Sequence, residues 1–483
     1  MEDESKNTSY TDFIIHSLEE ISLKEQFIIF YSVIKWTFLA TVIGAIVGAA
    51  TSFFLKFLSA ASLTAIKHKY YYLALPLVFY FNYLLVKAVP EIEGHGTEKV
   101  IEAIHKENGK IRWQVVPLKL ITTILTLAFG GSAGKEGPCA QIGGGIASIF
   151  SGMARLSPLD RKKLVICGIS GGFAAVFGTP IAGAIFGVEV LFVGTVLYDV
   201  LLPSFVAGIT SYQVSRFLGT EYFHFQINAV PTFSEGFFAK IIIAGLFFGI
   251  CSFLLIEFMQ FFTALAKKIK DNRRPFVGGL AIILLTMIFS EKYLGLGIPV
   301  IESSLNGQMN MWYDFLLKII FTSITLSFLG SGGIVTPIFF IGATSGTLFA
   351  DLLGLNRQIF AAIGLVSLVS GAANTPIAAS IMAIEMFGKD IAPFATITCV
   401  VSFLITGYRS VYPSQIISSD KCELVKSAIG KTIVNVHPEV AEDEVQKTLI
   451  GDTRNFAQTL KSKINFIEDF MNFYKKRGKK KQD

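Results

Sequence analysis

One carboxylate, Glu136, lies in a glycine-rich segment, Gly131–Pro138, that separates two long apolar runs. A related segment, Gly330–Pro337, follows 199 positions later, counted from the first glycine of each. A glycine-rich break exposes backbone N–H groups, and at membrane depth it is tolerated only where it is buried in protein or lines a cavity. Two breaks at matching places in two halves of a chain indicate a transport site at the interface between repeats.

Two prolines, Pro138 and Pro337, predict where two helices begin, because proline is favoured in a first helical turn, where its missing N–H is not needed. Residues 135–137 then present free backbone N–H groups at the positive end of one helix dipole, and Ile334 and Val335 do so at the other. Such ends bind anions without a basic side chain. The pattern therefore predicts an anion site from which the ion can leave quickly.

Glu136 is placed to compete with an anion for these amides. An ionisable residue inside a membrane segment is a functional candidate by default. Ionised Glu136 would occupy the anion position and protonated Glu136 would swing away, so permeation would depend on pH. The alternative is a helix-capping carboxylate without a gating role, but a cap at this place would block the site that it helps to form.

A third break, Gly94–Thr97, precedes a predicted helix, Glu98–His105. Its glycines free the backbone, and His95 between them would point toward the pathway. The sequence leaves open whether His95 is itself a ligand or proton carrier, or whether the neighbouring amides bind the anion.

The composition is that of a membrane protein. Of 483 residues, 52% are hydrophobic and 16% are charged, and the mean hydropathy is +0.57, whereas soluble domains carry about 25% charged residues. Long apolar stretches include Leu39–Phe54, Ile241–Leu255, Gly278–Phe289 and Ile359–Ala373. We therefore expect an all-α polytopic membrane protein. Many apolar stretches are short or broken by Gly and Pro, which predicts re-entrant half-helices.

The hydropathy divides the chain into three parts. We expect a cytoplasmic amphipathic segment over residues 1–30, a transmembrane domain over 31–419, and a short soluble basic tail over 420–483. The tail is predicted to contain one amphipathic helix, from Glu442 to Tyr474. Within the transmembrane domain, the two related halves are predicted at about 31–216 and 235–419.

A second pair of matched motifs supports the duplication. Thr179–Ala182 followed by Glu189 matches Thr375–Ala378 followed by Glu385, with an offset of 196 between the two glutamates. Two motif pairs in the same order predict a duplicated membrane fold. Broken helices that share one site favour an inverted orientation of the two copies.

The net charge of +6 is concentrated in two basic clusters, Lys267–Arg274 and Lys475–Lys481. The positive-inside rule places both clusters, and both chain termini, in the cytoplasm. The tail could contact membrane lipid, but a topology signal is the simpler interpretation, and we expect no nucleic-acid partner. The five cysteines are scattered without metal or redox spacing, so neither a metal nor a cofactor is expected.

These motifs resemble those of the CLC family of chloride channels and chloride/proton exchangers over roughly residues 30–420. Gly134–Pro138 matches the motif G(K/R)EGP, and Gly333–Pro337 matches GxFxP, with Val335 where Phe is usual. Residues 94–98 resemble GSGIP, with His95 for Ser and Glu98 for Pro. Tyr412 resembles the tyrosine whose hydroxyl meets the central anion, and Tyr408 is the second candidate.

The resemblance implies an inverted-repeat fold of tilted helices and a homodimer with one pore per subunit. It implies that Glu136 is the gating glutamate and that chloride is the default substrate. The absence of a regulatory domain pair suggests a multi-pass protein of a prokaryotic inner (plasma) membrane. The anion-binding positions carried over from the family are His95, Gly96, Lys135, Glu136, Gly137, Ile334, Val335 and Tyr412.

One departure from the family bears on proton coupling. Exchangers of the family carry an inner proton-transferring glutamate at the position where this chain has Val190, next to Glu189. Channels of the family also have an apolar residue there, and Glu189 could substitute for the missing acid. The sequence therefore leaves open a passive chloride channel and an unusually coupled chloride/proton exchanger.

Parts of the sequence also fit two other functions, fluoride/proton antiport and intramembrane proteolysis. A fluoride/proton antiporter of the same family is the nearer alternative, although fluoride-selective members usually alter the part of the motif where this chain keeps Pro138. Gly168–Gly172 fits the GxSG motif of intramembrane serine proteases, with Ser170 as nucleophile, but no histidine lies between His224 and His437 to act as its base. Small residues that let helices pack closely explain the motif more simply. We expect transport and not enzymatic catalysis.

Overall fold

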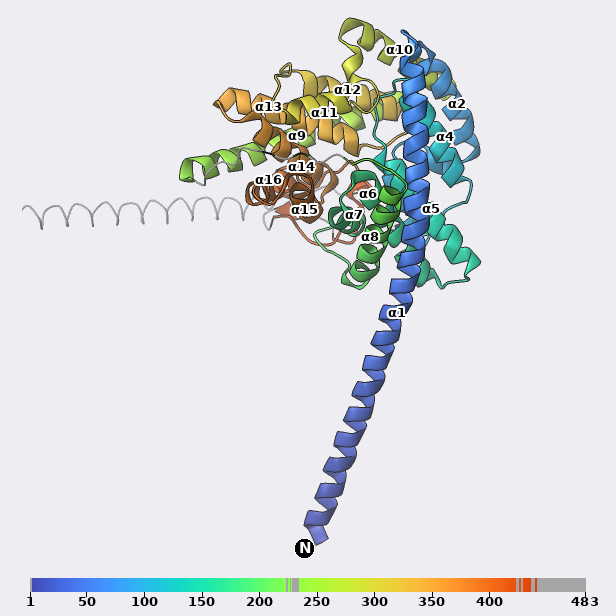
Figure 1. Cartoon of the computed structure of the whole chain (residues 1–483), viewed down its shortest axis with the longest axis vertical. Helices are drawn as coiled ribbons and strands as arrows, with labels where there is room; N and C mark the ends of the chain where they lie inside the picture. Colours follow the sequence, from blue (N-terminus) through green and yellow to red (C-terminus); the bar gives the residue numbers. More distant parts are fainter. Residues whose placement is uncertain are drawn as a thin grey trace, which may run out of the picture.

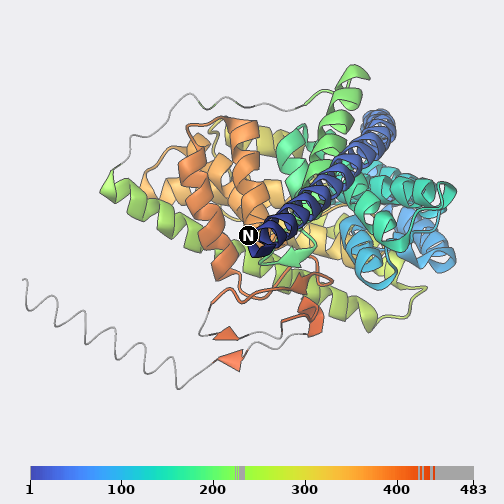
Figure 2. The same cartoon turned by 90° about the horizontal axis from the view of Figure 1, so that it is seen from below.

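The structure, a computed structural model, contains sixteen α-helices in its described part (Figures 1 and 2). It describes residues 2–222, 225, 227, 234–422, 425–426, 429–435 and 439–440, with no side-chain description over 2–23 and 439–440. The tail helix predicted from Glu442 to Tyr474 and the second basic cluster lie outside these residues. The first turns of α1 project away from the helical bundle (Figure 1).

The helices fall into two sets of eight in the same order. The first set is α1 Glu2–Ile66, α2 Leu75–Ala88, α3 Gly96–Lys106, α4 Val115–Ala128, α5 Glu136–Met153, α6 Pro158–Phe177, α7 Pro180–Glu189 and α8 Leu201–Phe217. The second set is α9 Glu235–Lys267, α10 Arg274–Ile288, α11 Ile298–Leu305, α12 Asp314–Ser327, α13 Val335–Leu353, α14 Arg357–Ala373, α15 Pro376–Phe387 and α16 Ala392–Ile405. This correspondence is the structural form of the predicted repeat.

Short elements connect the helices. The 3-10 helices are η1 Tyr71–Ala74, η2 Pro90–Ile92, η3 Tyr198–Val200, η4 Glu291–Tyr293 and η5 Ile433–Asn435. Strand β1 (Phe192–Val193) pairs in parallel with β2 (Ile416–Ile417), and β3 (Val425–Lys426) pairs antiparallel with β4 (Glu439–Val440). The β1–β2 pair joins the chain that follows α7 to the segment that follows α16.

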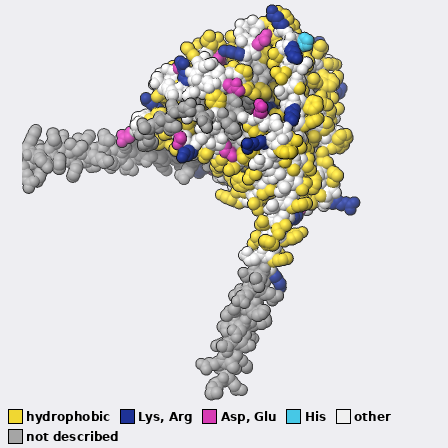
Figure 3. Space-filling view, in the orientation of Figure 1, with side chains coloured by type: hydrophobic (Ala, Val, Ile, Leu, Met, Phe, Trp, Pro, Cys, Tyr) yellow, Lys and Arg dark blue, Asp and Glu magenta, His cyan; other side chains and the backbone are white. Residues whose placement is uncertain are grey.

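Only part of the helical content is long enough to cross a bilayer. Four described stretches are long and apolar enough, and six apolar helices are shorter. The long stretches are Lys24–Ile66, Tyr71–Ala88, Glu235–Lys267 and Val335–Leu353. The broken-helix expectation is thus confirmed. The expected boundary at residue 30 falls inside the continuous helix α1, and apolar side chains cover the surface around α1, α2 and α4 (Figure 3).

The two halves exchange equivalent contacts. Gly134 donates its N–H to the carbonyl of Gly333 at 2.7 Å, and Gly333 donates to the carbonyl of Gly134 at 2.6 Å. A two-fold relation between the halves would produce such a reciprocal exchange between equivalent residues, as in an isologous interface. The antiparallel pairing of these two residues fits the predicted inversion.

The matched glutamates make a second reciprocal exchange. Both carboxylate oxygens of Glu189 accept backbone N–H groups of Ile377–Ala378 at the start of α15, at 3.0 and 2.8 Å. Glu385 accepts those of Ile181–Ala182 at the start of α7, at the same two distances. Each carboxylate therefore caps the helix of the opposite half, where the helix dipole favours its negative charge.

Candidate anion site at three helix ends

The N-termini of α3, α5 and α13 meet at three glycines. A Cβ atom on Gly96 would lie 2.5 Å from the carbonyl oxygen of Gly137, and one on Gly333 would lie 2.7 Å from the amide nitrogen of Gly137. Side chains at Gly96 or Gly333 would therefore force the helix ends apart. Pro138 and Pro337 lie in the first turns of α5 and α13, as predicted. Each end contributes N–H groups that have no acceptor within its own helix.

Glu136 accepts hydrogen bonds where these ends meet. Its side chain is 2% exposed. Oε2 accepts the backbone N–H of Thr336 at 3.0 Å and that of Lys135 at 3.1 Å, and Oε1 accepts the hydroxyl of Thr336 at 2.5 Å. The carboxylate thus receives donors of the kind that a bound anion would receive at a helix N-terminus.

The amide of α13 that donates to Glu136 belongs to a residue that was not among the predicted anion-binding positions. The donor is Thr336, through both its backbone and its hydroxyl. The prediction that Ile334 and Val335 offer their N–H groups to a bound anion stays a prediction. Ile334 is the N-cap residue of α13, and Val335 is its first residue. Thr336 was not predicted as a site residue. The feature that could have indicated it is a hydroxyl side chain in the first turn of a helix that is expected to bind an anion.

Three buried polar groups near these ends lack hydrogen-bond partners among the described residues. They are Nδ1 of His95, Oγ1 of Thr97 and the hydroxyl of Tyr412. The rings of His95 and Tyr412 meet edge to face, with centroids 5.5 Å apart. Buried polar groups without partners are costly unless a ligand or ordered water satisfies them. The three groups are therefore candidate contacts of a central anion.

A buried lysine holds the turn that carries His95. Nζ of Lys119 donates to the carbonyl of Ile92 at 3.0 Å and to that of Gly94 at 2.5 Å. In the second half, Nζ of Lys318 donates to the carbonyls of Tyr293 and Gly295, both at 3.0 Å. The matched positions of the two lysines belong to the repeat seen in the sequence. That each lysine holds a turn by donating to two of its carbonyls, which we call the lysine clamp, is seen only in the structure.

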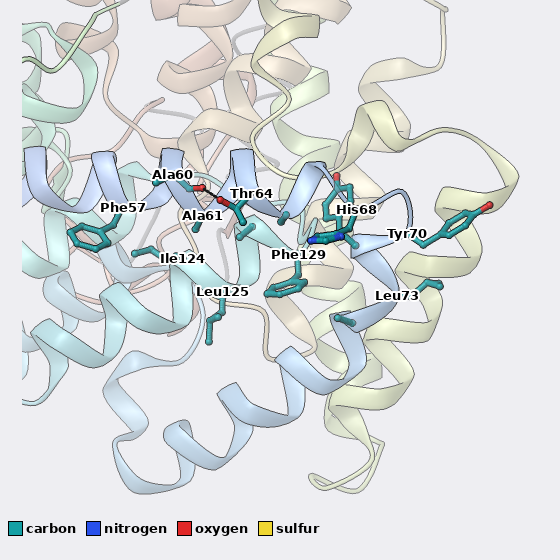
Figure 4. A pocket seen from close by; sticks show the side chains of 14 residues that line it. Phe57, Ala60, Ala61, Thr64, His68, Tyr70, Leu73, Ile124, Leu125 and Phe129 are labelled. Carbon is teal, nitrogen blue, oxygen red and sulfur yellow. Dashed lines mark hydrogen bonds between the residues drawn. The ribbon is translucent and has the colours of Figure 1, made fainter.

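Two cavities approach the site, one reaching Glu136 and the other reaching His95. The first, of about 300 Å³, is lined by side chains that include Lys135, Glu136 and Thr336. The second, of about 700 Å³, is lined by side chains that include His95 and Lys267. We call them the Glu136 cavity and the His95 cavity. A larger cavity of about 1000 Å³, along the last turns of α1, contains none of the predicted site residues (Figure 4).

The expected inner proton position is apolar in the structure as well. Val190 is buried just after α7, and its carbonyl accepts Nε2 of Gln415 at 2.9 Å. The neighbouring Glu189 uses both oxygens as a helix cap. The suggestion that Glu189 replaces the missing acid therefore gains no support from the geometry.

Two other candidate residues, Tyr408 and Ser170, make structural contacts. The hydroxyl of Tyr408 donates to the carbonyl of Val425 at 2.9 Å and accepts the N–H of Lys421 at 2.8 Å, so it joins the membrane domain to the following segment. Ser170 is fully buried in α6 and donates to the carbonyl of Ala184 at 3.0 Å. That contact fits the expected helix packing and not an accessible nucleophile.

Comparison with known proteins agrees with the motifs. A family model described as voltage gated chloride channel matches residues 77–407. A chloride/fluoride channel protein of Pseudomonas syringae pv. tomato is 36% identical over 396 residues, covering 80% of this chain and 87% of the relative. The voltage-gated ClC-type chloride channel ClcB of Shigella flexneri is 28% identical, covering 65% of this chain and 77% of the relative.

Solved structures show the same fold. A CLC-type fluoride/proton antiporter superposes with a TM-score of 0.76 at 32% identity, covering 80% of this chain and 98% of the other. A slow cyanobacterial Cl⁻/H⁺ antiporter superposes with a TM-score of 0.67 at 20% identity, covering 77% and 94%. The chain therefore belongs to the CLC family of voltage gated chloride channels and related antiporters, and is an integral membrane protein of all-α, inverted-repeat fold that transports anions.

Proposed function

We propose that the protein exchanges a small halide for protons and that Glu136 is the gate. The observation that carries the proposal is the set of donors around the Glu136 carboxylate: Thr336 by its amide and hydroxyl, and Lys135 by its amide. A carboxylate and a halide need the same donors, so the two exclude each other. Protonation removes the negative charge that these donors favour, and Glu136 then leaves the position to the anion.

The other groups act on the anion. The hydroxyls of Thr97 and Tyr412 can donate to it, and His95 can donate through Nδ1 in the corresponding tautomer. Lys119 keeps the His95 turn in place through the carbonyl of Gly94 and does not itself need to touch the anion. An anion held by neutral donors can leave more readily than one paired with a full positive charge.

Fluoride is the first candidate substrate and chloride the second. Fluoride is small and strongly hydrated, so it needs strong hydrogen-bond donors when it loses water, and three buried polar groups without partners are available here. Relatives named for fluoride are 36% and 32% identical to this chain. Chloride is favoured by Pro138 and Tyr412, which keep the motifs of the chloride-transporting members that the sequence resembles.

The proposal also assigns a membrane side to each cavity and an oligomeric state to the protein. Lys267 lines the His95 cavity and belongs to the first basic cluster, which the positive-inside rule assigns to the cytoplasm. The His95 cavity would then open to the cytoplasm and the Glu136 cavity to the outside. Both termini would be cytoplasmic, and the protein would form a homodimer with one pathway per subunit in a prokaryotic inner membrane.

The test is transport by purified protein in liposomes under a fluoride or a chloride gradient. An ion-selective electrode follows the anion, and a pH indicator follows protons at the same time. We expect anion flux that drives protons uphill, and we expect Glu136→Gln to pass anions without moving protons. Glu302→Gln changes a carboxylate that also lines the Glu136 cavity and should behave as wild type.

Three outcomes would contradict parts of the proposal. Absence of flux for both anions from folded protein would contradict halide transport. Anion flux without proton movement in the wild type would leave a passive channel and contradict exchange. Unchanged proton movement in Glu136→Gln would place the gate elsewhere.

A further inference from the structure

Exchange through this site needs a group that brings protons to Glu136 from the side of the His95 cavity. The proposed function supplies one carboxylate, Glu136 itself, which reaches only the opposite cavity. Val190 cannot titrate, and both oxygens of Glu189 are occupied by backbone N–H groups. Because an N–H group can only donate, it stabilises an ionised partner and offers nothing to a protonated one. Glu189 is therefore held as a cap.

Glu98 lies in a different setting, in the first turn of α3. It is half-buried, and both of its oxygens share one backbone N–H, that of Ser414, at 3.1 and 3.3 Å. Its Oε1 also accepts the hydroxyl of Ser414 at 2.5 Å. A serine hydroxyl can donate to a carboxylate or accept from a carboxylic acid. Glu98 can therefore be satisfied in either protonation state. Its partner Ser414 directly follows Pro413, which lines the His95 cavity, so Glu98 lies next to that cavity and not in its lining.

Glu98 and Glu136 stand on either side of one contact between helix ends. Glu98 follows Thr97 in α3, and Glu136 precedes Gly137 in α5. Oγ1 of Thr97 lies 3.4 Å from the place where a Cβ on Gly137 would stand. The hydroxyls of Thr97 and Tyr412 are buried there and have no hydrogen-bond partner within the described part of the chain. A site with several unpartnered polar atoms is one where ordered water can bridge two groups.

We propose that Glu98 is the proton-transfer group that serves Glu136 from the side of the His95 cavity, through water held by Thr97 and Tyr412. This inference depends on the proposed exchange function. In the transfer step, the O–H bond at Glu98 breaks and an O–H bond forms at Glu136, by relay through the bridging water. Glu98 is left ionised and takes its next proton from solution, and the same steps run in reverse when protons move inward.

The charged and titratable groups around Glu98 fit this role. On its own helix, Lys99 lies beside it and Glu102 one turn away, and Glu102 pairs with both Lys99 and Lys106. The segment after α16 contributes Tyr412 and Ser414. Glu98 has no ion pair among the described residues. It is therefore not fixed in one charge state by a cation.

The experiment compares Glu98→Gln with Glu102→Gln in the liposome assay. The glutamine keeps an oxygen that accepts from Ser414, so the local packing is retained. A positioned proton-transfer group typically contributes about 10²–10⁴-fold to the rate of its step. We therefore expect anion flux to persist while proton movement, and with it the ratio of protons to anions, falls by at least about 100-fold. Glu102→Gln removes a carboxylate from the same helix and should keep the wild-type ratio. Glu98→Asp should restore part of the coupling.

The outcomes separate this inference from the proposed function. A wild-type proton-to-anion ratio in Glu98→Gln would overturn the role of Glu98 and leave exchange intact. Absence of proton movement in the wild type would overturn exchange, and the role of Glu98 with it. If Glu98→Gln does not fold, Ser414→Ala decides the matter: a lowered ratio with retained anion flux supports the relay, and an unchanged ratio overturns it.

Discussion

The hydroxyl of Thr336 should set the pH at which the gate opens. It donates to Oε1 of Glu136 at 2.5 Å, and the amide of the same residue donates to Oε2. Thr336→Val removes the hydroxyl, keeps the shape and leaves the amide donor in place. The hydroxyl stabilises the ionised, blocking form of Glu136, so its removal makes protonation and departure of the carboxylate easier.

The magnitude follows from the type of bond. A hydrogen bond to a charged group contributes about 1.5–3 kcal/mol. At about 1.4 kcal/mol per pH unit, loss of the Thr336 hydroxyl should move the pH of half-maximal anion flux upward by roughly one to two units. The shift is measured by recording initial efflux from liposomes over a series of external pH values, with wild-type and variant protein at equal density.

The matched control is Thr344→Val in the same helix. The hydroxyl of Thr344 is buried and donates to the carbonyl of Phe340 at 2.8 Å, away from Glu136. The control should leave the pH of half-maximal flux unchanged. If Thr336→Val also leaves it unchanged, or moves it to lower pH, then the contact with Glu136 does not hold the gate closed and the reasoning is wrong.

Two further pairs of variants test the structural roles assigned above. Lys119→Met and Lys318→Met should each lower the free energy of unfolding by roughly 2–5 kcal/mol, because two buried carbonyls lose their donor; unchanged thermal unfolding in detergent would contradict the clamp. Glu189→Gln and Glu385→Gln should each destabilise the protein by roughly 1–3 kcal/mol and keep the proton-to-anion ratio, because both residues are caps. Loss of coupling in Glu189→Gln alone would show that Glu189 carries protons.

The sequence predicted the fold because its signals are local. Pro138 and Pro337 determine where α5 and α13 begin, whatever the rest of the chain does. The apolar stretches coincide with α1, α9, α10 and α14, except that the third runs one residue past the end of α10, and the two motif pairs reveal the repeat before any contact is known. The small residues around Ser170 likewise indicate close helix packing, and the structure shows Ser170 fully buried.

The details of the site depend on how the two halves pack. The relative position of the N-termini of α13 and α5 determines which amide of α13 donates to Glu136. In the structure this donor is the amide of Thr336 and not that of Val335. The role of Glu189 could not be read from its own segment, since its partners begin at Ile377, in the other half of the chain. The same holds for Glu98, whose partner Ser414 lies 316 residues away.

The two halves share the same helix order but differ at the anion site, and under the proposed function this difference leaves one gate, at Glu136. The repeat offset that relates Gly134 to Gly333 places Val335 where Glu136 stands in the first half. Glu136 therefore reaches across to the end of α13, whereas Val335 has no carboxylate with which to reach back to α5. The reciprocal caps of Glu189 and Glu385 and the equivalent lysines Lys119 and Lys318 are present in both halves, whereas the carboxylate of Glu136 has no counterpart at the equivalent position. A second glutamate at this position would place two negative charges in one anion site, where only one could be ionised at a time.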